Sequence, residues 1–477
     1  MSTPSAVPTK LIATTDDPYF LALHYLNTVF PGDRGPGLWC YKGQFLAWYG
    51  TSWRTIDREL IEDQIFRALA ATRIPADDSA EKSIPISRRF VDEVVRSLEV
   101  HTRAPWRSLP TWTSPTPSHP PSSTCIGLQD TVVSCHNGTL ALIPRDSTWL
   151  DPCIVPVSYD PEALCPRWHQ CLSEWSLNDP AWIALLQRWL GYCLMGTRKY
   201  ERWLLLYGKV RGGKGTIGRI LEAMLGRGQG VSSKSFRVLL DKNGLWGLQS
   251  ARVLRIGEIY HLERGKHSAC SLIKQLVGRD PVEIGQKYIR SVQSTVCPCA
   301  IMAESNELPN LADEAQGLSS KMLVLPFNRS FLHQEEFDLY ETLLTELPGI
   351  VHWAIQGALA LEAETDPTLK WPEPLGSSEV RQDYKQTVNV FEDFLESRCV
   401  RTLKGRVRYD MLYAEWIDFR KRNLIKGHDV APQWLGHHLK TKTSWDLETK
   451  RHMIEGNKSR FVYGLSLRRR GDEQDIH

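Results

Sequence analysis

The chain has 477 residues, of which 42% are hydrophobic and 24% are charged, and its formal net charge is only +3. This length is enough for about three domains, and the composition excludes disorder over most of the chain. No window offers the roughly 18 uninterrupted apolar residues of a membrane helix, and the opening sequence MSTPSAVPTK lacks the pattern of a secretory signal. The 11 cysteines form no zinc-ribbon pattern, and the closest pair is Cys297 and Cys299, so we expect reduced thiols in a cytoplasmic protein.

The first part of the chain predicts small α/β elements. Residues 1–15 are expected to form a flexible tail, and aromatic alternation followed by helical patterns predicts an α/β module over 16–107. The segment 108–125 is rich in Pro, Ser and Thr, which is typical of a linker. Short strands and then helices are expected over 126–198.

A phosphate-binding loop is predicted in the middle of the sequence. The strand pattern WLLLYG leads into GKVRGGKGT, and a helical pattern follows, which is the context that Gly-x-x-x-x-Gly-Lys requires. Glycines let backbone N–H groups turn toward phosphate oxygens, the helix points its positive end at the same anion, and the lysine reaches the β- and γ-phosphates of ATP. The candidate ATP-binding residues are Gly208, Arg211, Gly212, Gly213, Lys214, Gly215 and Thr216.

The residue after the lysine departs from the usual motif. Ser or Thr ordinarily stands there to hold Mg²⁺, whereas this chain has Gly215 and places Thr216 one residue later. Thr216 is therefore the candidate magnesium ligand on the loop. The alternatives are a chance glycine loop and a nucleoside monophosphate kinase, although such kinases carry the loop at the start of a shorter chain.

A second acidic motif follows in ARVLRIGEIYHLERG. An apolar strand that ends in an acid forms the second half of an ATPase site, where the acid orients Mg²⁺ or polarises the attacking water. Glu258 is the candidate for both roles, and an ordinary glutamate at the end of an edge strand is the alternative. The alternating segments that continue to about residue 331 predict a parallel sheet covered by helices.

Three further segments follow the acidic motif, namely LIKQLVGRDPVEIGQKY (272–288), AIMAESNELPNLAD (300–313) and SSKMLVLPFNRSF (319–331). They resemble the superfamily 3 helicases, and more narrowly the helicase half of phage and plasmid primase-helicases related to the poxvirus primase-helicase. Their order and spacing match that family, and a weaker likeness covers nearly the whole chain. The resemblance implies an AAA+-like P-loop ATPase core with a parallel sheet over 199–350, an α/β region before it, a helical connector at 351–389 and a C-terminal winged helix at 390–477.

The resemblance also implies roles for single residues. Asn306 would be the sensor that hydrogen-bonds the γ-phosphate or the attacking water, and an ordinary Asn-Glu-Leu-Pro turn is the alternative. Lys274, Lys287 and Arg290 would lie on or near a hairpin that faces DNA phosphates, or they are solvated surface charges.

The trans-acting arginine of these hexameric enzymes falls at Lys321, and this is a departure from the family. Lysine lacks the planar fork that clasps a transferring phosphate. Either Lys321 serves, or nearby Arg329 does, or turnover is slow.

The last segment combines basic charge with the elements of a winged helix. From Arg401 onward there are 17 Lys and Arg against 10 Asp and Glu, over three helical patterns from about residue 390 and two strand-like stretches. The helix QWLGHHLKTK is the candidate for entering a DNA groove, with Lys440 and Lys442 on phosphates, and Arg468–Arg470 follow the last strand. A winged helix used for protein contact and a merely solvated surface are the alternatives.

The start of the chain lacks the metal-binding pattern of a primase. The family often carries an N-terminal primase domain with carboxylates spaced as Asp-x-Asp and a distant His. Residues 1–200 show no such constellation, because Asp16 and Asp17 are adjacent. We therefore expect no primer synthesis by this chain.

These observations together predict an ATP-dependent DNA helicase with ATP and Mg²⁺ as cofactors. We expect a homo-hexamer that acts on single-stranded DNA and forks during replication of a mobile element, phage or plasmid, alongside a separate primase or replication initiator. Two alternatives stay open: a nucleotide-dependent DNA-binding initiator without processive unwinding, and a degenerate relative that hydrolyses ATP weakly.

Overall fold

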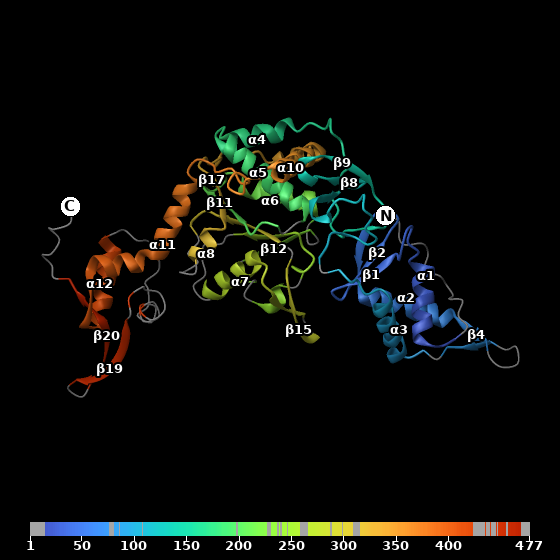
Figure 1. Ribbon diagram of the computed structural model, residues 1–477, viewed down its shortest axis with the longest axis horizontal. Helices are drawn as coiled ribbons and strands as arrows, with labels where there is room; N and C mark the ends of the chain where they lie inside the picture. Colours follow the sequence, from blue (N-terminus) through green and yellow to red (C-terminus); the bar gives the residue numbers. More distant parts are fainter. Residues whose placement is uncertain are drawn as a thin grey trace. The chain divides into compact units, whose positions relative to one another are not determined.

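The computed structural model divides the chain into two compact units, Met1–Pro309 with Lys321–Ser378 and Asn310–Ser320 with Glu379–His477 (Figure 1). None of the helices in the described part of the chain combines the length and apolar character that crossing a bilayer requires. The structure describes residues 15–75, 81–84, 86–106, 108–196, 199–226, 230–235, 238, 241–245, 247–257, 266–286, 289–297, 299–308, 315–422, 435, 439, 445, 447–454 and 457–468.

The first unit begins with three helices packed around a small apolar core. Helix α3 shows why they pack: Val91, Val94, Val95 and Leu98 recur at helical spacing and are all buried. A three-stranded antiparallel sheet in the order β1-β2-β3 lies within the same region. The elements are α1 (Pro18–Val29), β1 (Leu38–Tyr41), β2 (Gln44–Trp48), β3 (Trp53–Ile56), α2 (Arg58–Ala71), β4 (Arg73–Pro75), β5 (Glu81–Ser83) and α3 (Arg88–His101).

The Pro-, Ser- and Thr-rich segment expected to be a linker is packed rather than extended. Its strand β6 pairs with β10, and buried Trp112 stacks on His119 with ring centroids 4.2 Å apart. The buried indole explains the difference, because it anchors a segment whose composition alone is typical of loops. The elements here are β6 (Thr111–Trp112), β7 (Cys125–Gly127), β8 (Thr131–Ser134), β9 (Ala141–Pro144) and β10 (Trp149–Leu150).

A five-stranded parallel sheet in the order β12-β13-β16-β11-β17 forms the centre of this unit. The predicted parallel α/β fold is therefore confirmed, and the sheet is consistent with a P-loop core. The runs WLLL and MLVLPF are wholly buried, as strands covered on both faces require. The strands are β11 (Trp203–Gly208), β12 (Val231–Ser235), β13 (Val253–Gly257), β16 (Ala300–Ser305) and β17 (Met322–Phe327).

Helices cover the sheet, and one continuous apolar core joins α5, α6 and α10 to its strands. Figure 1 shows α5, α6 and α10 gathered on one side of the sheet and α7 on the other. Helix α10 runs across residue 350 and α11 across residue 390, so both expected domain boundaries fall inside helices. The helices of this unit are α4 (Pro166–Ser176), α5 (Pro180–Met195), α6 (Lys214–Leu225), α7 (Lys266–Gly278), α9 (Leu339–Thr345) and α10 (Leu347–Ala363). Helix α11 (Ser377–Arg398) belongs almost wholly to the second unit.

A buried ion pair ties the sheet to the chain that precedes it. The Arg252 guanidinium, at the start of β13, contacts the Asp151 carboxylate and donates to the backbone carbonyl of Leu194. The side chains of Arg252 and Asp151 are only 5% and 1% exposed. The Asp151 carboxylate, which precedes the phosphate loop in the sequence, thus neutralises the charge of Arg252 next to β13.

The second unit contains a three-stranded antiparallel sheet in the order β18-β20-β19. The predicted helix VFEDFLESRCV ends earlier than expected, because the chain is extended from Cys399 onward and forms the unpredicted strand β18. The predicted helix around QWLGHHLKTK lies mostly outside the described residues, although Leu435 and Leu439 are buried in this unit's core. The elements are α8 (Ala315–Ser319), β18 (Cys399–Arg408), α12 (Tyr409–Arg422), β19 (Glu448–Ile454) and β20 (Asn457–Leu467).

Candidate functional site

The predicted glycine-rich loop connects the end of β11 to the start of α6. The loop is held against the neighbouring strand, because the Lys209 N–H donates to the Phe327 carbonyl at 2.9 Å. Helix α6 begins at Lys214, and the N–H groups of Thr216 and Ile217 donate to the Gly213 carbonyl, whereas those of Lys214 and Gly215 come too early in the helix to have a carbonyl partner within it. Such a helix start attracts anions, and phosphate is the usual one.

Two glycines in this loop are required by its geometry. Gly208 has φ 136°, and a Cβ built there would lie 2.2 Å from the Phe327 carbonyl oxygen. Gly213 has φ 105°, and its Cβ would lie 2.6 Å from the indole ring of Trp175 on α4. Both positions combine a left-handed backbone with direct overlap, so any side chain there strains the loop.

The ammonium of Lys214 is held over the loop itself. Its Nζ donates to the carbonyl of Gly208 at 2.8 Å and to the carbonyl of Lys209 at 2.6 Å, and the residue is buried. Burial lowers the pKa of Lys214, and the nearby Glu304 carboxylate opposes that shift. A positive charge is therefore placed where the loop curves.

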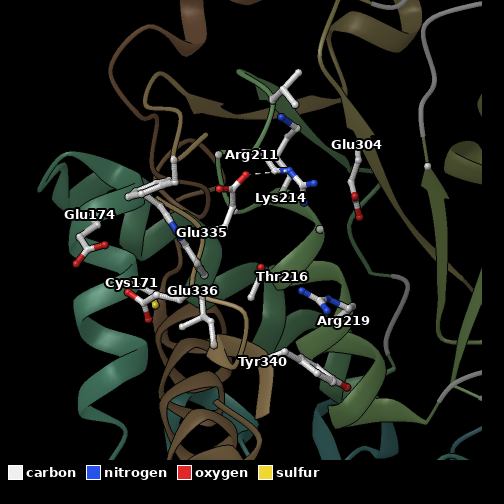
Figure 2. Close-up of a pocket in the computed structure, with 18 of the residues that line it drawn as sticks. Cys171, Glu174, Arg211, Lys214, Thr216, Arg219, Glu304, Glu335, Glu336 and Tyr340 are labelled. Carbon is white, nitrogen blue, oxygen red and sulfur yellow. Dashed lines mark ion pairs between the residues drawn. The ribbon is translucent and has the colours of Figure 1, made fainter. Parts of the chain in front are cut away.

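A cavity of about 1160 Å³ opens in front of the loop (Figure 2). Lys214 and Thr216 from α6 line it together with Asn306, which directly follows β16. Arg211, Gly212, Gly213 and Gly215 line it as well. The ends of three neighbouring parallel strands thus meet at one edge of the sheet.

The predicted catalytic acid Glu258 lies outside the described residues. Its neighbour Gly257, the last residue of β13, lines the same cavity. Strand β13 therefore ends at this cavity, and the role of Glu258 stays a prediction.

A partly buried charge network lies at the cavity wall, and the sequence interpretation did not include it. The Arg255 guanidinium on β13 donates to Glu304 on β16 at 2.6 Å and to Glu222 on α6 at 2.9 Å. The Ser233 hydroxyl also donates to Glu222, at 2.5 Å. The three charged side chains are only 12–16% exposed, so one guanidinium joins two carboxylates at the cavity wall.

The alternation of side chains between the two faces of β16 is the sequence signal that could have suggested part of this network. Glu304 and Asn306 are two residues apart at the end of one strand, and residues at that spacing point to the same face. The partners of Glu304 come from two other elements, which no local pattern identifies.

The opposite wall of the cavity comes from α4 and the segment that follows β17. Arg211 in the loop pairs with Glu335, with a 3.6 Å separation between Nε and Oε1, as the dashed line in Figure 2 marks. The Arg219 guanidinium on α6 lies 4.7 Å from the centre of the Tyr340 ring. The Arg167 guanidinium of α4 donates to both oxygens of Glu336 at 2.7 Å. Apart from Arg211, these residues were not predicted, because their segments match no nucleotide motif.

Lys321 and Arg329 are not among the residues that line the cavity. Lys321 directly precedes β17, and its carbonyl accepts from the N–H of Trp203 at the start of β11, so it lies at the amino end of the strands. Its ammonium hydrogen-bonds Glu201 and, with Arg279, lowers the pKa of that carboxyl. Arg329 is exposed, with its guanidinium 4.6 Å from the ring centre of Phe331.

The candidate DNA-contacting residues are only partly placed. Lys274 lies on α7 and is half-buried, and Arg290 lies on β15 (Ile289–Thr295), which pairs with β14 (Val282–Gln286) as a hairpin. Arg468 follows β20 and donates from Nε to the Cys399 carbonyl at 3.3 Å. The other candidates lie outside the described residues, namely Lys287, Lys440, Lys442, Arg469 and Arg470.

The acidic residues near the start of the chain have structural contacts. Asp17 caps helix α1 by accepting from the Tyr19 N–H at 2.8 Å. Asp16 pairs with Lys82 at 3.8 Å.

The comparisons with known proteins do not establish a function for this chain. Neither a protein-family model nor a curated protein sequence matches the chain. Three apo structures of the NrS-1 C-terminal region are similar to it, with TM-scores of 0.45, 0.49 and 0.46 at 12%, 13% and 13% identity. These matches cover 94%, 95% and 94% of this chain and 100% of each of those chains. A likeness this distant carries no argument about function.

Proposed function

We propose that this chain is a Mg²⁺-dependent ATPase of the superfamily 3 helicase type, which couples ATP hydrolysis to movement along single-stranded DNA and to duplex separation. One observation carries the proposal: Lys214, Thr216 and Asn306 line a single cavity at the carboxyl edge of a parallel sheet. Its volume of about 1160 Å³ is ample for a nucleoside triphosphate. The sequence motifs around Asn306 supply the DNA-dependent part of the proposal.

The donors at the cavity suit a magnesium nucleotide. Lys214 and the N–H groups at the start of α6 would bind the β- and γ-phosphates, and Asn306 would orient the γ-phosphate or the attacking water. Thr216 and Glu258 are the proposed protein ligands of Mg²⁺, and Glu258 would also polarise that water. The bound Mg²⁺ would neutralise charge on the phosphates.

We propose a homo-hexameric ring of the AAA+ type. The phosphate-loop strand β11 lies inside the sheet between β16 and β17, which supports that assignment. Lys321 lies at the amino end of the strands, away from its own cavity, and this position supports action on the nucleotide of a neighbouring copy.

We propose that the second unit is a winged helix that contacts DNA phosphates. Helix α12 and the sheet order β18-β20-β19 support this assignment, and so does the excess of Lys and Arg in this part of the sequence. The setting would be replication of a mobile element, phage or plasmid in the cytoplasm. A separate primase or replication initiator would act together with this chain.

One observation favours a second candidate function. Gly215 removes the hydroxyl that ordinarily helps to hold Mg²⁺, which favours a weakly hydrolysing DNA-binding relative. An initiator that binds nucleotide and DNA without processive unwinding would share the same cavity.

DNA-stimulated ATP hydrolysis, measured together with strand separation on a forked duplex, distinguishes these functions. The helicase predicts both activities, and both would be lost in Lys214→Ala while oligomerisation is kept. Turnover without strand separation favours the initiator. Failure of the wild-type chain to hydrolyse any nucleotide contradicts the helicase and favours the degenerate relative.

A further inference from the structure

Position 215 of the phosphate loop faces a carboxylate. A Cβ built on Gly215 would have Glu304 Oε2 as its nearest neighbour, at 4.0 Å. The usual motif places a Ser or Thr hydroxyl at this position to bind the metal of the nucleotide. Glu304 therefore offers an oxygen ligand on the side where the loop lacks one.

A hydrogen bond from Arg255 holds the Glu304 side chain in place. Arg255 Nε donates to Glu304 Oε1 at 2.6 Å, whereas Oε2 is the oxygen nearest position 215. The carboxylate is only 14% exposed, and it lines the same cavity as Lys214 and Thr216. Oε1 is thus held by the Arg255 guanidinium, and Oε2 faces position 215 of the loop.

The charges around this carboxylate favour a cation. Arg255 serves both Glu222 and Glu304, so these three side chains together carry one excess negative charge. A carboxylate beside a triphosphate is repelled in a partly buried site unless a positive charge lies between them. Mg²⁺ is bound in this way in proteins, by one or two carboxylates together with phosphate oxygens.

We propose that Glu304 is a ligand, directly or through water, of a divalent cation such as Mg²⁺ or Mn²⁺ that binds with the nucleotide. It would replace the hydroxyl that Gly215 lacks. This inference rests on the proposed nucleotide site and adds a residue that the loop motif does not predict. Asn306, two residues later, would then serve the phosphate while Glu304 serves the metal.

The test measures how strongly the metal improves nucleotide binding to the full chain. The affinity for a non-hydrolysable ATP analogue is determined by calorimetry in Mg²⁺ and in EDTA, and the ratio of the two is compared between variants. Glu304→Gln keeps the size of the side chain and an oxygen for Arg255 but loses the charge. We expect its Mg²⁺-dependent gain in affinity to fall roughly tenfold or more, with the affinity in EDTA retained.

A second substitution tests the replacement directly. Gly215→Ser restores the hydroxyl in a place with ordinary van der Waals room, so it should recover the metal effect in the Glu304→Gln background. Glu222→Gln is the matched comparison, because it removes the same charge from the Arg255 network but leaves the Glu304 carboxylate in place, so it should lose less of the metal effect than Glu304→Gln. Counting bound Mn²⁺ by electron paramagnetic resonance, with the analogue present, gives a readout independent of affinity.

The outcomes separate this inference from the proposed function. An unchanged metal effect in Glu304→Gln, or an equal loss in Glu222→Gln, overturns the role of Glu304 while the nucleotide site stands. A wild-type chain that binds no nucleotide overturns both. If Glu304→Gln does not fold, Glu304→Asp carries the test, because its shorter side chain should weaken the metal effect and Gly215→Ser should restore it.

Discussion

The two edges of the central sheet differ in what they gather. At the carboxyl edge, a buried lysine, a partly buried network of three charged side chains and glycines with positive φ surround a cavity of about 1160 Å³. At the amino edge, Lys321, Arg279 and Glu201 form ion pairs whose side chains are 34–45% exposed. The contrast shows that partly buried charges surround a cavity at one edge, whereas the other edge carries charges that are exposed to solvent.

The energetic consequence of this contrast is that the edges should respond differently to mutation. Charges in a partly buried site interact strongly, whereas exposed ion pairs contribute little to stability. Substitutions at the carboxyl edge should therefore change nucleotide binding and hydrolysis within one subunit. Those at the amino edge should leave the subunit's stability nearly unchanged and act only through a neighbouring copy.

The largest effect is expected for Lys214→Ala. Removing the only ammonium placed over the loop by the described residues should lower DNA-stimulated ATP hydrolysis by about 10³-fold, because that charge stabilises the transferring phosphate. Steady-state phosphate release measures the loss, with size-exclusion chromatography to confirm that assembly is kept. Near-normal turnover would contradict the role of this loop.

Lys321→Ala should reduce hydrolysis by about 10²-fold without changing nucleotide affinity of the single subunit. Arg279→Ala is the matched control, because Arg279 contacts the same Glu201 but should hardly affect turnover. Mixing Lys321→Ala with Lys214→Ala chains should recover part of the activity, since each supplies what the other lacks. No recovery, together with equal losses in both amino-edge variants, would contradict action between copies.

Gly213→Ala should destabilise the folded state by about 1–3 kcal/mol, because a side chain there meets Trp175 at a left-handed backbone position. Gly215→Ala is the comparison, because the nearest atom to its added Cβ would lie 4.0 Å away and alanine favours the helix. Urea unfolding followed by circular dichroism measures both. Equal free energies of unfolding for the two variants would contradict this prediction, because they would show that the Trp175 side chain moves away from the new methyl group at little cost.

The smallest effect concerns pH at the amino edge. Lys321 lowers the pKa of Glu201 in the folded state below its ordinary value of 4.5. The associated stability is therefore present above pH 4.5 and is lost as the pH falls through the lower folded pKa. Because both side chains are partly exposed, Lys321→Ala should remove less than about 1 kcal/mol of this acid-dependent stability. Unfolding midpoints between neutral and acidic pH measure the difference.

The sequence predicted the elements whose signal is local. The strand WLLLYG, the glycine-rich loop and helix α6 follow one another as expected, and the parallel sheet around them is confirmed. These features depend on neighbouring residues, such as a buried apolar run or a left-handed glycine, which a pattern can reveal.

The parts that sequence reasoning missed depend on contacts between distant residues. Arg255 takes partners from α6 and β16, and Trp175 reaches the loop from α4, so no local spacing encodes either contact. Strand β18 was missed because the helical pattern before it continues to Cys399. The chain is extended there because it pairs with β20, which is distant in the sequence. At such places, contacts between distant residues override the helix or strand propensity of the local sequence.

The Asp151–Arg252 pair bears on how the region that contains the central sheet can be isolated. A fragment that starts near residue 199 would lack Asp151 and the Leu194 carbonyl, so the Arg252 guanidinium would lose both of these partners. The same cut removes α5, whose apolar residues share a core with α6 and α10. The minimal autonomous fragment therefore has to begin upstream of Asp151, and a shorter one should be recovered as aggregate rather than as a weakened enzyme.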